Sequence, residues 1–156
     1  MKKLLSILIF TTISSTVFAR GLTTVPRVTL SGMNYLNGKS VTAFFVSGRA
    51  PGFSTPGSMP RVRSVFKKVG PMKISNGTVS IPSTSFIESG WSKYNYLQVI
   101  VHNPSQKTVG IRNLDGSVPY GQTWLKPNDF AAFNNIRVYF VKKDRLGRGT
   151  IDLSSY

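Results

Sequence analysis

MKISNGTVSI, residues 72–81, holds two short alternating runs on either side of Asn76-Gly77. A type I′ turn needs positive φ at both central residues, and Asn-Gly between alternating runs is the strongest short-range signal for it. The stretch therefore predicts a two-residue β-hairpin with one apolar face. The expected cross-strand pairs are Ile74 with Val79 and Met72 with Ile81.

The same period of two extends over most of the chain and predicts further strands. Two more turn signals separate such runs: Asn37-Gly38 predicts a second hairpin, and Asn103-Pro104 opens another reversal. The runs that flank these turns span residues 27–36, 39–48, 96–103 and 107–113. The last two strands are expected within 135–143 and 149–153, joined by a basic loop.

Helical signals are scarce, and only residues 128–135 could form a turn or two of helix. About ten short strands with closely spaced turns predict an all-β fold, either an antiparallel β-sandwich or a small barrel. From Tyr94 onward, a strand enters NPS, returns through TVGI and is followed by WLKPNDF before a late strand. This order resembles bacterial immunoglobulin-like modules, which implies a sandwich for the second half. The Cys…Trp…Cys core of true immunoglobulin domains is absent, so no family is assigned.

The first 19 residues have the three parts of a secretory signal peptide. Lys2 and Lys3 form the charged region, an apolar run reaches about Ile13, and Val17-Phe18-Ala19 has the small-x-small pattern of a cleavage site. The apolar run is about half of the ~20 residues that a membrane-spanning helix needs. We expect export to the periplasm or out of the cell, removal of residues 1–19, and no transmembrane segment in the mature chain.

Residues 20–156 suit a single β-rich domain with its own core. Residues 48–61 hold three Pro and three Gly without an apolar period, so we expect a long surface loop inside that domain. The chain contains no cysteine. Stability must therefore come from packing, and thiol chemistry and cysteine-based metal sites are excluded.

Catalytic side chains are few. The one histidine, His102, lies at the expected end of a strand, where a hydrogen-bonded edge position is the simpler interpretation. Glu88 is the only glutamate, the four aspartates lie mostly in turn signals, and no phosphate-binding glycine loop is present. We expect no enzymatic activity, no cofactor and no metal site, with a His102-dependent hydrolase as the least favoured alternative.

Positive charge is the dominant feature of the composition. The formal net charge is +15 at pH 7, and residues 20–87 carry nine basic residues and no acid. The candidate anion-binding residues form two clusters: Arg61, Arg63, Lys67, Lys68 and Lys73, then Lys142, Lys143, Arg145 and Arg148, with Arg137 nearby. Lys68 breaks the alternation of Arg61, Arg63 and Lys67, which predicts a bulge or an edge strand. Lysines on an edge strand can also serve only to prevent aggregation between sheets. That role does not explain why residues 20–87 lack acids, since a surface of mixed charge would keep the protein equally soluble.

These features predict an exported, strongly basic binding module for an anionic envelope or extracellular polymer. The candidate partners are lipopolysaccharide or another membrane surface, a cell-wall polymer, a glycosaminoglycan or the DNA backbone. The alternative is a structural or interaction protein of the envelope or surface: an assembly subunit, an adhesin component or an inhibitor that recognises a protein. Phe53, Met59 and Trp91 are candidate contacts for such a partner. Trp91, between Gly90 and Ser92, is expected to be exposed, whereas most other aromatic residues belong to the core.

Overall fold

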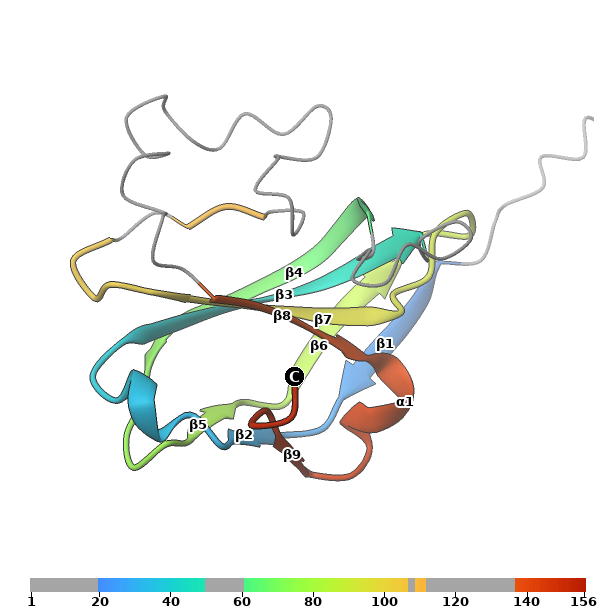
Figure 1. Ribbon diagram of the computed structural model, residues 1–156. Coiled ribbons are helices and arrows are strands. Elements are labelled where there is room, and N and C mark those ends of the chain that lie inside the picture. Colours follow the sequence, from blue (N-terminus) through green and yellow to red (C-terminus); the bar gives the residue numbers. More distant parts are fainter. Residues whose placement is uncertain (1–19, 50–60, 107–108, 112–136) are drawn as a thin grey trace, which may run out of the picture.

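The computed structural model describes residues 20–49, 61–106, 109–111 and 137–156. Strands dominate these residues and lie in two facing layers (Figure 1), which confirms the predicted all-β fold. No helix in this part of the chain is long and apolar enough to cross a membrane. The predicted signal peptide, most of the loop at 48–61, and residues 128–135 lie outside the described residues, as does much of the immunoglobulin-like stretch, so those interpretations stay predictions.

One layer is a four-stranded antiparallel sheet in the order β4, β3, β7, β8. Its strands are β3 (Ser40–Arg49), β4 (Arg61–Lys73), β7 (Tyr96–His102) and β8 (Arg137–Lys142). The two inner strands, β3 and β7, are buried along almost their whole length because both faces of this sheet carry apolar side chains. Among the described strands, β4 lies at one edge of the sheet and β8 at the other.

The second layer is a ribbon interrupted by prolines. Strands β1 (Gly21–Val25) and β6 (Thr84–Glu88) pair, and so do β2 (Val28–Ser31) and β5 (Val79–Ile81). Val25 pairs with Thr84, and three residues further along each strand Val28 pairs with Ile81, so both ladders keep one register. The break between them contains Pro26 and Pro82, which have no N–H to donate.

The main core lies between the two layers. Phe45 of β3 is 1% exposed and lies at its centre, with its ring 5.1 Å from that of Phe86 and 5.8 Å from that of Tyr94. A second apolar cluster covers the opposite face of the large sheet, where its members include Phe44, Ile100, Phe140, Val109 and Ile111. Phe86, Tyr94 and Tyr96 are all buried, as the sequence predicted for most of the aromatic residues.

The turn at Asn76-Gly77 forms as predicted, with positive φ at both residues (51° and 67°) and two backbone hydrogen bonds between Ser75 and Thr78. The predicted pairing beyond the turn is wrong. The strand before the turn stays in the large sheet, where Met72 pairs with Val41, while Val79 joins β2 in the other layer. The two arms diverge because each can bury its apolar face only by joining its own layer.

Asn37-Gly38 does not close a hairpin, contrary to the prediction. Asn37 has φ −52° and ψ 139°, Gly38 has φ 81°, and Lys39 N–H donates to the Leu36 carbonyl, which together describe a type II turn. With the 3₁₀ turn η1 (Asn34–Leu36), it carries the chain from β2 in one layer to β3 in the other.

The reversal after β7 also differs from the prediction. The turn forms, with Gln106 N–H donating to the Asn103 carbonyl, but residues 109–111 are not a strand. The two edges of β7 are already occupied by β3 and β8.

The last two strands form, but in different layers, linked by the one-turn helix α1 (Lys143–Leu146). Strand β9 (Thr150–Asp152) pairs parallel with β2, an exception to the expected antiparallel arrangement.

Candidate anion-binding site

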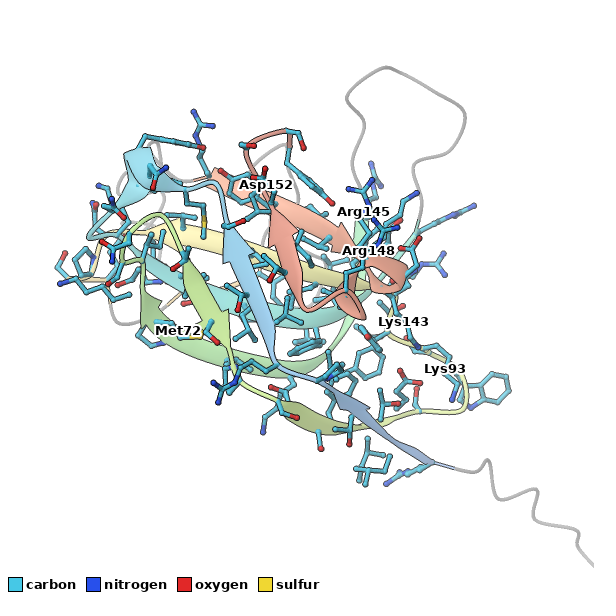
Figure 2. The ribbon with its side chains drawn as sticks, turned by 90° about the horizontal axis from the view of Figure 1, so that it is seen from below. Met72, Lys93, Lys143, Arg145, Arg148 and Asp152 are labelled. Carbon is cyan, nitrogen blue, oxygen red and sulfur yellow. The ribbon has the colours of Figure 1, made fainter. Side chains whose placement is uncertain are left out.

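Basic side chains gather where strands of the large sheet end together. Because the strands alternate in direction, the end of β3, the start of β4, the start of β7 and the end of β8 share one end of the sheet. Arg49 pairs with Arg61, Val46 with Tyr96, and Tyr96 with Lys142. We call this the basic end, and it comprises Arg49, Arg61, Arg63, Lys93, Lys142, Lys143, Arg145 and Arg148. Figure 2 shows Lys93, Lys143, Arg145 and Arg148 on one side of the molecule, with Met72 on the opposite side.

Asn95 holds this end of the sheet together. Its side-chain amide accepts a hydrogen bond from Gly48 N–H at 2.8 Å and donates one to the Gly48 carbonyl at 2.7 Å. Its backbone carbonyl accepts from Lys143 N–H at 2.9 Å, and its own N–H donates to the Val46 carbonyl at 3.1 Å. Asn95 therefore links the end of β3 to the start of α1, and so fixes the spacing between Arg49 and the cations of α1.

Aromatic rings position two of the α1 cations. Lys143 Nζ lies 4.5 Å from the centre of the Tyr94 ring, and the Arg145 guanidinium lies 5.4 Å from the centre of the Tyr156 ring. Arg145 also donates a hydrogen bond of 2.7 Å to the Tyr156 hydroxyl. Leu146 anchors the helix because its side chain is 1% exposed in the main core. These contacts orient the two cations and leave their positive charge uncancelled.

Two acids accompany these cations: Asp144, which is exposed on α1 between Lys143 and Arg145, and Glu88, which is almost fully buried. The Glu88 carboxylate lies 3.4 Å from Lys93 Nζ, accepts a hydrogen bond from Tyr94 N–H, and belongs to a side chain only 5% exposed. Burial, and then the Glu88 charge, raise the pKa of Tyr94, so its hydroxyl stays protonated. Among the described residues, Lys93–Glu88 is the one ion pair. The other cations of the basic end have no acid within salt-bridge distance in this part of the chain.

Two hollows border the basic end. One has a volume of about 410 Å³ and is lined by Phe140, Lys142, Asp144, Arg145, Ser155 and Tyr156. The other has a volume of about 580 Å³ and is lined by Asn95, Tyr96, Lys142, Lys143 and Asp144. Lys142 and Asp144 border both, so each hollow has one carboxylate beside its two cations. Hollows of this size suit one sugar or nucleotide unit, so a charged group of a polymer has room to approach these lysines.

The structure divides the first predicted cluster along β4. Arg61 and Arg63 lie at the basic end, whereas Lys73 pairs with Ser40 at the other end of the sheet. A strand of 13 residues spans on the order of 40 Å. Lys67 and Lys68 lie between and pair with Phe45 and Phe44, which belong to opposite apolar clusters. The predicted bulge or edge position is confirmed, because β4 lies at an edge of the sheet among the described strands and its register shifts three times against β3.

Arg137 is also separated from the second cluster. It pairs with Val101 at the opposite end of β8 from Lys142. There its guanidinium donates a 3.0 Å hydrogen bond to the Tyr35 hydroxyl and lies 4.8 Å from the centre of the Tyr35 ring. The Tyr35 hydroxyl is in turn 2.9 Å from that of Tyr139. Burial is the main cause that raises the pKa of Tyr139 to about 12, and its hydrogen bond with Tyr35 is the second.

His102 has the hydrogen-bonded role expected from the sequence, although on an inner strand and not at an edge. Its side chain is 2% exposed, with Nε2 2.9 Å from the Thr42 hydroxyl and Nδ1 2.9 Å from the Asn103 carbonyl. Burial is the main cause that lowers its pKa below the ordinary value. The ring is therefore neutral at pH 7 and closed to a substrate from solvent.

Trp91 is 81% exposed, as predicted, in the turn that links Ser89 to Ser92. Phe53 and Met59 lie outside the described residues.

Three residues at this end of the sheet were not identified from the sequence: Arg49, Lys93 and Asn95. Arg49 carries a recoverable signal, since it precedes the loop opposite Arg61, whereas nothing local marks Asn95 as the residue that bridges two strand ends.

Comparison of the chain with protein-family models, with curated proteins and with solved structures finds no match.

Proposed function

We propose that the protein is an exported, non-enzymatic binding module that holds an anionic envelope or extracellular polymer at its basic end. The observation that carries this proposal is the gathering of eight cations from β3, β4, β8, α1 and the adjoining turns at one end of the large sheet. Two acids accompany them among the described residues, Glu88 and Asp144. Glu88 is already engaged with Lys93.

The expected mode of binding is electrostatic. A polyanion surrounds itself with condensed counterions, and a protein that replaces them gains free energy from their release. The cations of the basic end come from several elements and are largely exposed, so they suit a flexible chain of negative charges better than one small buried anion. The field of such a strongly basic protein would also speed the encounter with an anionic partner.

A salt titration with matched charge variants tests this proposal. A short DNA duplex serves as the probe, and its affinity is measured by fluorescence anisotropy at several salt concentrations. The variant Arg63→Gln, Lys142→Gln, Arg148→Gln removes three cations of the basic end. The control Arg27→Gln, Lys39→Gln, Lys73→Gln removes three cations elsewhere and has the same net charge.

The slope of log affinity against log salt should become shallower by about 2.7 in the first variant, because each phosphate that a cation engages contributes about 0.9 to the slope. It should change little in the control. The same ranking is expected with a heparin oligosaccharide, because no base edge is read. Equal changes in both variants would show that only the net charge matters, and the proposal would fail.

A further inference from the structure

Three apolar side chains point into solvent beside the basic end. Leu22 and Ile87 are direct cross-strand partners on the outer face of the β1–β6 ribbon and are 73% and 60% exposed. Their neighbours Phe86 and Glu88 point inward and are buried, so the alternation of β6 fixes Ile87 outward. Trp91, 81% exposed, follows in the next turn. We call Leu22, Ile87 and Trp91 the apolar tip.

The apolar tip and the basic end meet at the turn between β6 and β7. Gly21, next to Leu22, pairs with Glu88, and Glu88 binds Lys93. Tyr94 follows directly and lies beneath Lys143. Figure 2 shows Lys93 and Lys143 close together on this side of the molecule. The apolar tip therefore lies next to the turn that carries Lys93, and Lys143, which has no acid within salt-bridge distance among the described residues, lies beside that turn.

This combination distinguishes between classes of anionic partner. A soluble polyanion gains from the cations but offers nothing that would take three apolar side chains out of water. An anionic lipid surface uses both features, because its headgroups attract lysine and arginine while the boundary below them accepts leucine, isoleucine and tryptophan. Tryptophan is enriched at that boundary, where its ring is apolar and its N–H stays hydrated.

We propose that the apolar tip enters the headgroup region of an anionic lipid surface while the basic end holds the phosphates. The inference rests on the proposed function, since it requires the basic end to attract anions, and it names the partner as a lipid surface. The small residues Gly90 and Ser92 on either side of Trp91 leave the indole ring as the most prominent side chain of its turn.

Vesicle binding provides the test. The purified chain lacking residues 1–19 is sedimented with vesicles of phosphatidylcholine mixed with phosphatidylglycerol, and with vesicles of phosphatidylcholine alone. The variant Leu22→Thr, Ile87→Thr keeps β-forming residues at two exposed positions and leaves the charge unchanged. Tyr35→Thr, which removes an exposed aromatic residue at the opposite end of the sandwich, is the control. A Trp124→Phe background makes Trp91 the single tryptophan, and quenching by brominated acyl chains reports its depth.

We expect binding to the mixed vesicles and little binding to phosphatidylcholine alone. The double threonine variant should bind the mixed vesicles at least about tenfold more weakly, with its affinity for the DNA duplex unchanged, and brominated lipids should quench Trp91. Vesicle binding that is unaffected by the double variant, or absent while the duplex still binds, would overturn the lipid inference and leave the proposed function standing. Absence of binding to both vesicles and duplex in the wild type would remove both. If the duplex still binds and the apolar tip is found to contact a protein, that protein and not a lipid surface is the partner of the apolar tip.

Discussion

Replacing Glu88 by glutamine should strengthen the binding of polyanions. The Glu88 carboxylate cancels the charge of Lys93 at a distance of 3.4 Å, so its removal adds one available cation to the basic end. Glutamine has nearly the same shape, and its carbonyl oxygen can still accept the hydrogen bond from Tyr94 N–H. The turn that carries Lys93 should therefore keep its conformation.

The size of the effect follows from the number of phosphates engaged. If Lys93 then engages one more phosphate of a DNA duplex, the slope of log affinity against log salt becomes steeper by about 0.9. The free energy of unfolding should fall by no more than about 1 kcal/mol, because the Lys93 side chain is 60% exposed and such ion pairs contribute little. Anisotropy titrations at several salt concentrations measure the slope, and urea denaturation measures the stability.

Asp152→Asn is the matched control. It also removes one carboxylate, and asparagine keeps an oxygen that can accept the hydrogen bond from Ser154 N–H. Asp152 lies on β9, well away from Lys93 (Figure 2). Its slope should stay within error of the wild type. A slope that steepens equally in both variants, or that does not change in Glu88→Gln, would refute the reasoning that the basic end is where the polyanion binds.

Three further predictions concern stability. Phe45→Ala should lower the free energy of unfolding by about 3–5 kcal/mol, measured by urea denaturation, because it opens a cavity at the centre of the main core. Gly77→Ala should destabilise more than Gly38→Ala in thermal melts: both have positive φ, but a Cβ on Gly77 would collide with the Asn34 side chain, whereas one on Gly38 meets nothing. The lowered pKa of His102 means that the unfolded chain takes up this proton first. The contribution of His102 to stability should then be fully present well above about pH 6.5 and should be lost as the pH falls through and below that value. The loss of stability on acidification should be smaller in His102→Gln, and a steeper fall in that variant would contradict this assignment.

Local chemistry allowed some features to be predicted and long-range packing decided the rest. The turn at Asn76-Gly77 was predictable because two adjacent residues supply both positive φ angles. Asn37-Gly38 is the same dipeptide but forms a different type of turn, because Asn37 has an extended ψ of 139°. The chain crosses from one layer to the other at this turn. The choice of layer depends on which partner strand buries each apolar face, and no short window of sequence contains that partner.

The burial of β7 was also predictable only in part from the sequence. Gln98 and His102 alternate with Leu97, Val99 and Val101, which is typical of a strand with one solvent-facing side. In the fold Gln98 is 0% and His102 2% exposed, because β7 lies inside a sheet that is covered on both faces. The pattern therefore predicted the strand and its inward face correctly, but not the cover on the other face.

For the candidate site, the clusters of charge could be found in the sequence but not their grouping in space. Arg61 and Lys73 are near neighbours in the chain, yet an extended β4 places them at opposite ends of the sheet. Arg61 and Lys142 are distant in the chain, yet the register of β3, β7 and β8 brings them to the same end. Register depends on pairings between remote segments, which is why Asn95 was missed.

Mapping where a polyanion contacts the protein tests the central claim most directly. Backbone amide shifts are followed by two-dimensional NMR while a short heparin oligosaccharide is added to the chain lacking residues 1–19. We expect the largest shifts at Arg49, Arg61, Arg63, Lys93 to Asn95 and Lys142 to Arg148, with the amides of Lys39, Lys73 and Arg137 nearly unmoved. Shifts concentrated at those three residues, or spread evenly over the exposed cations, would contradict the account.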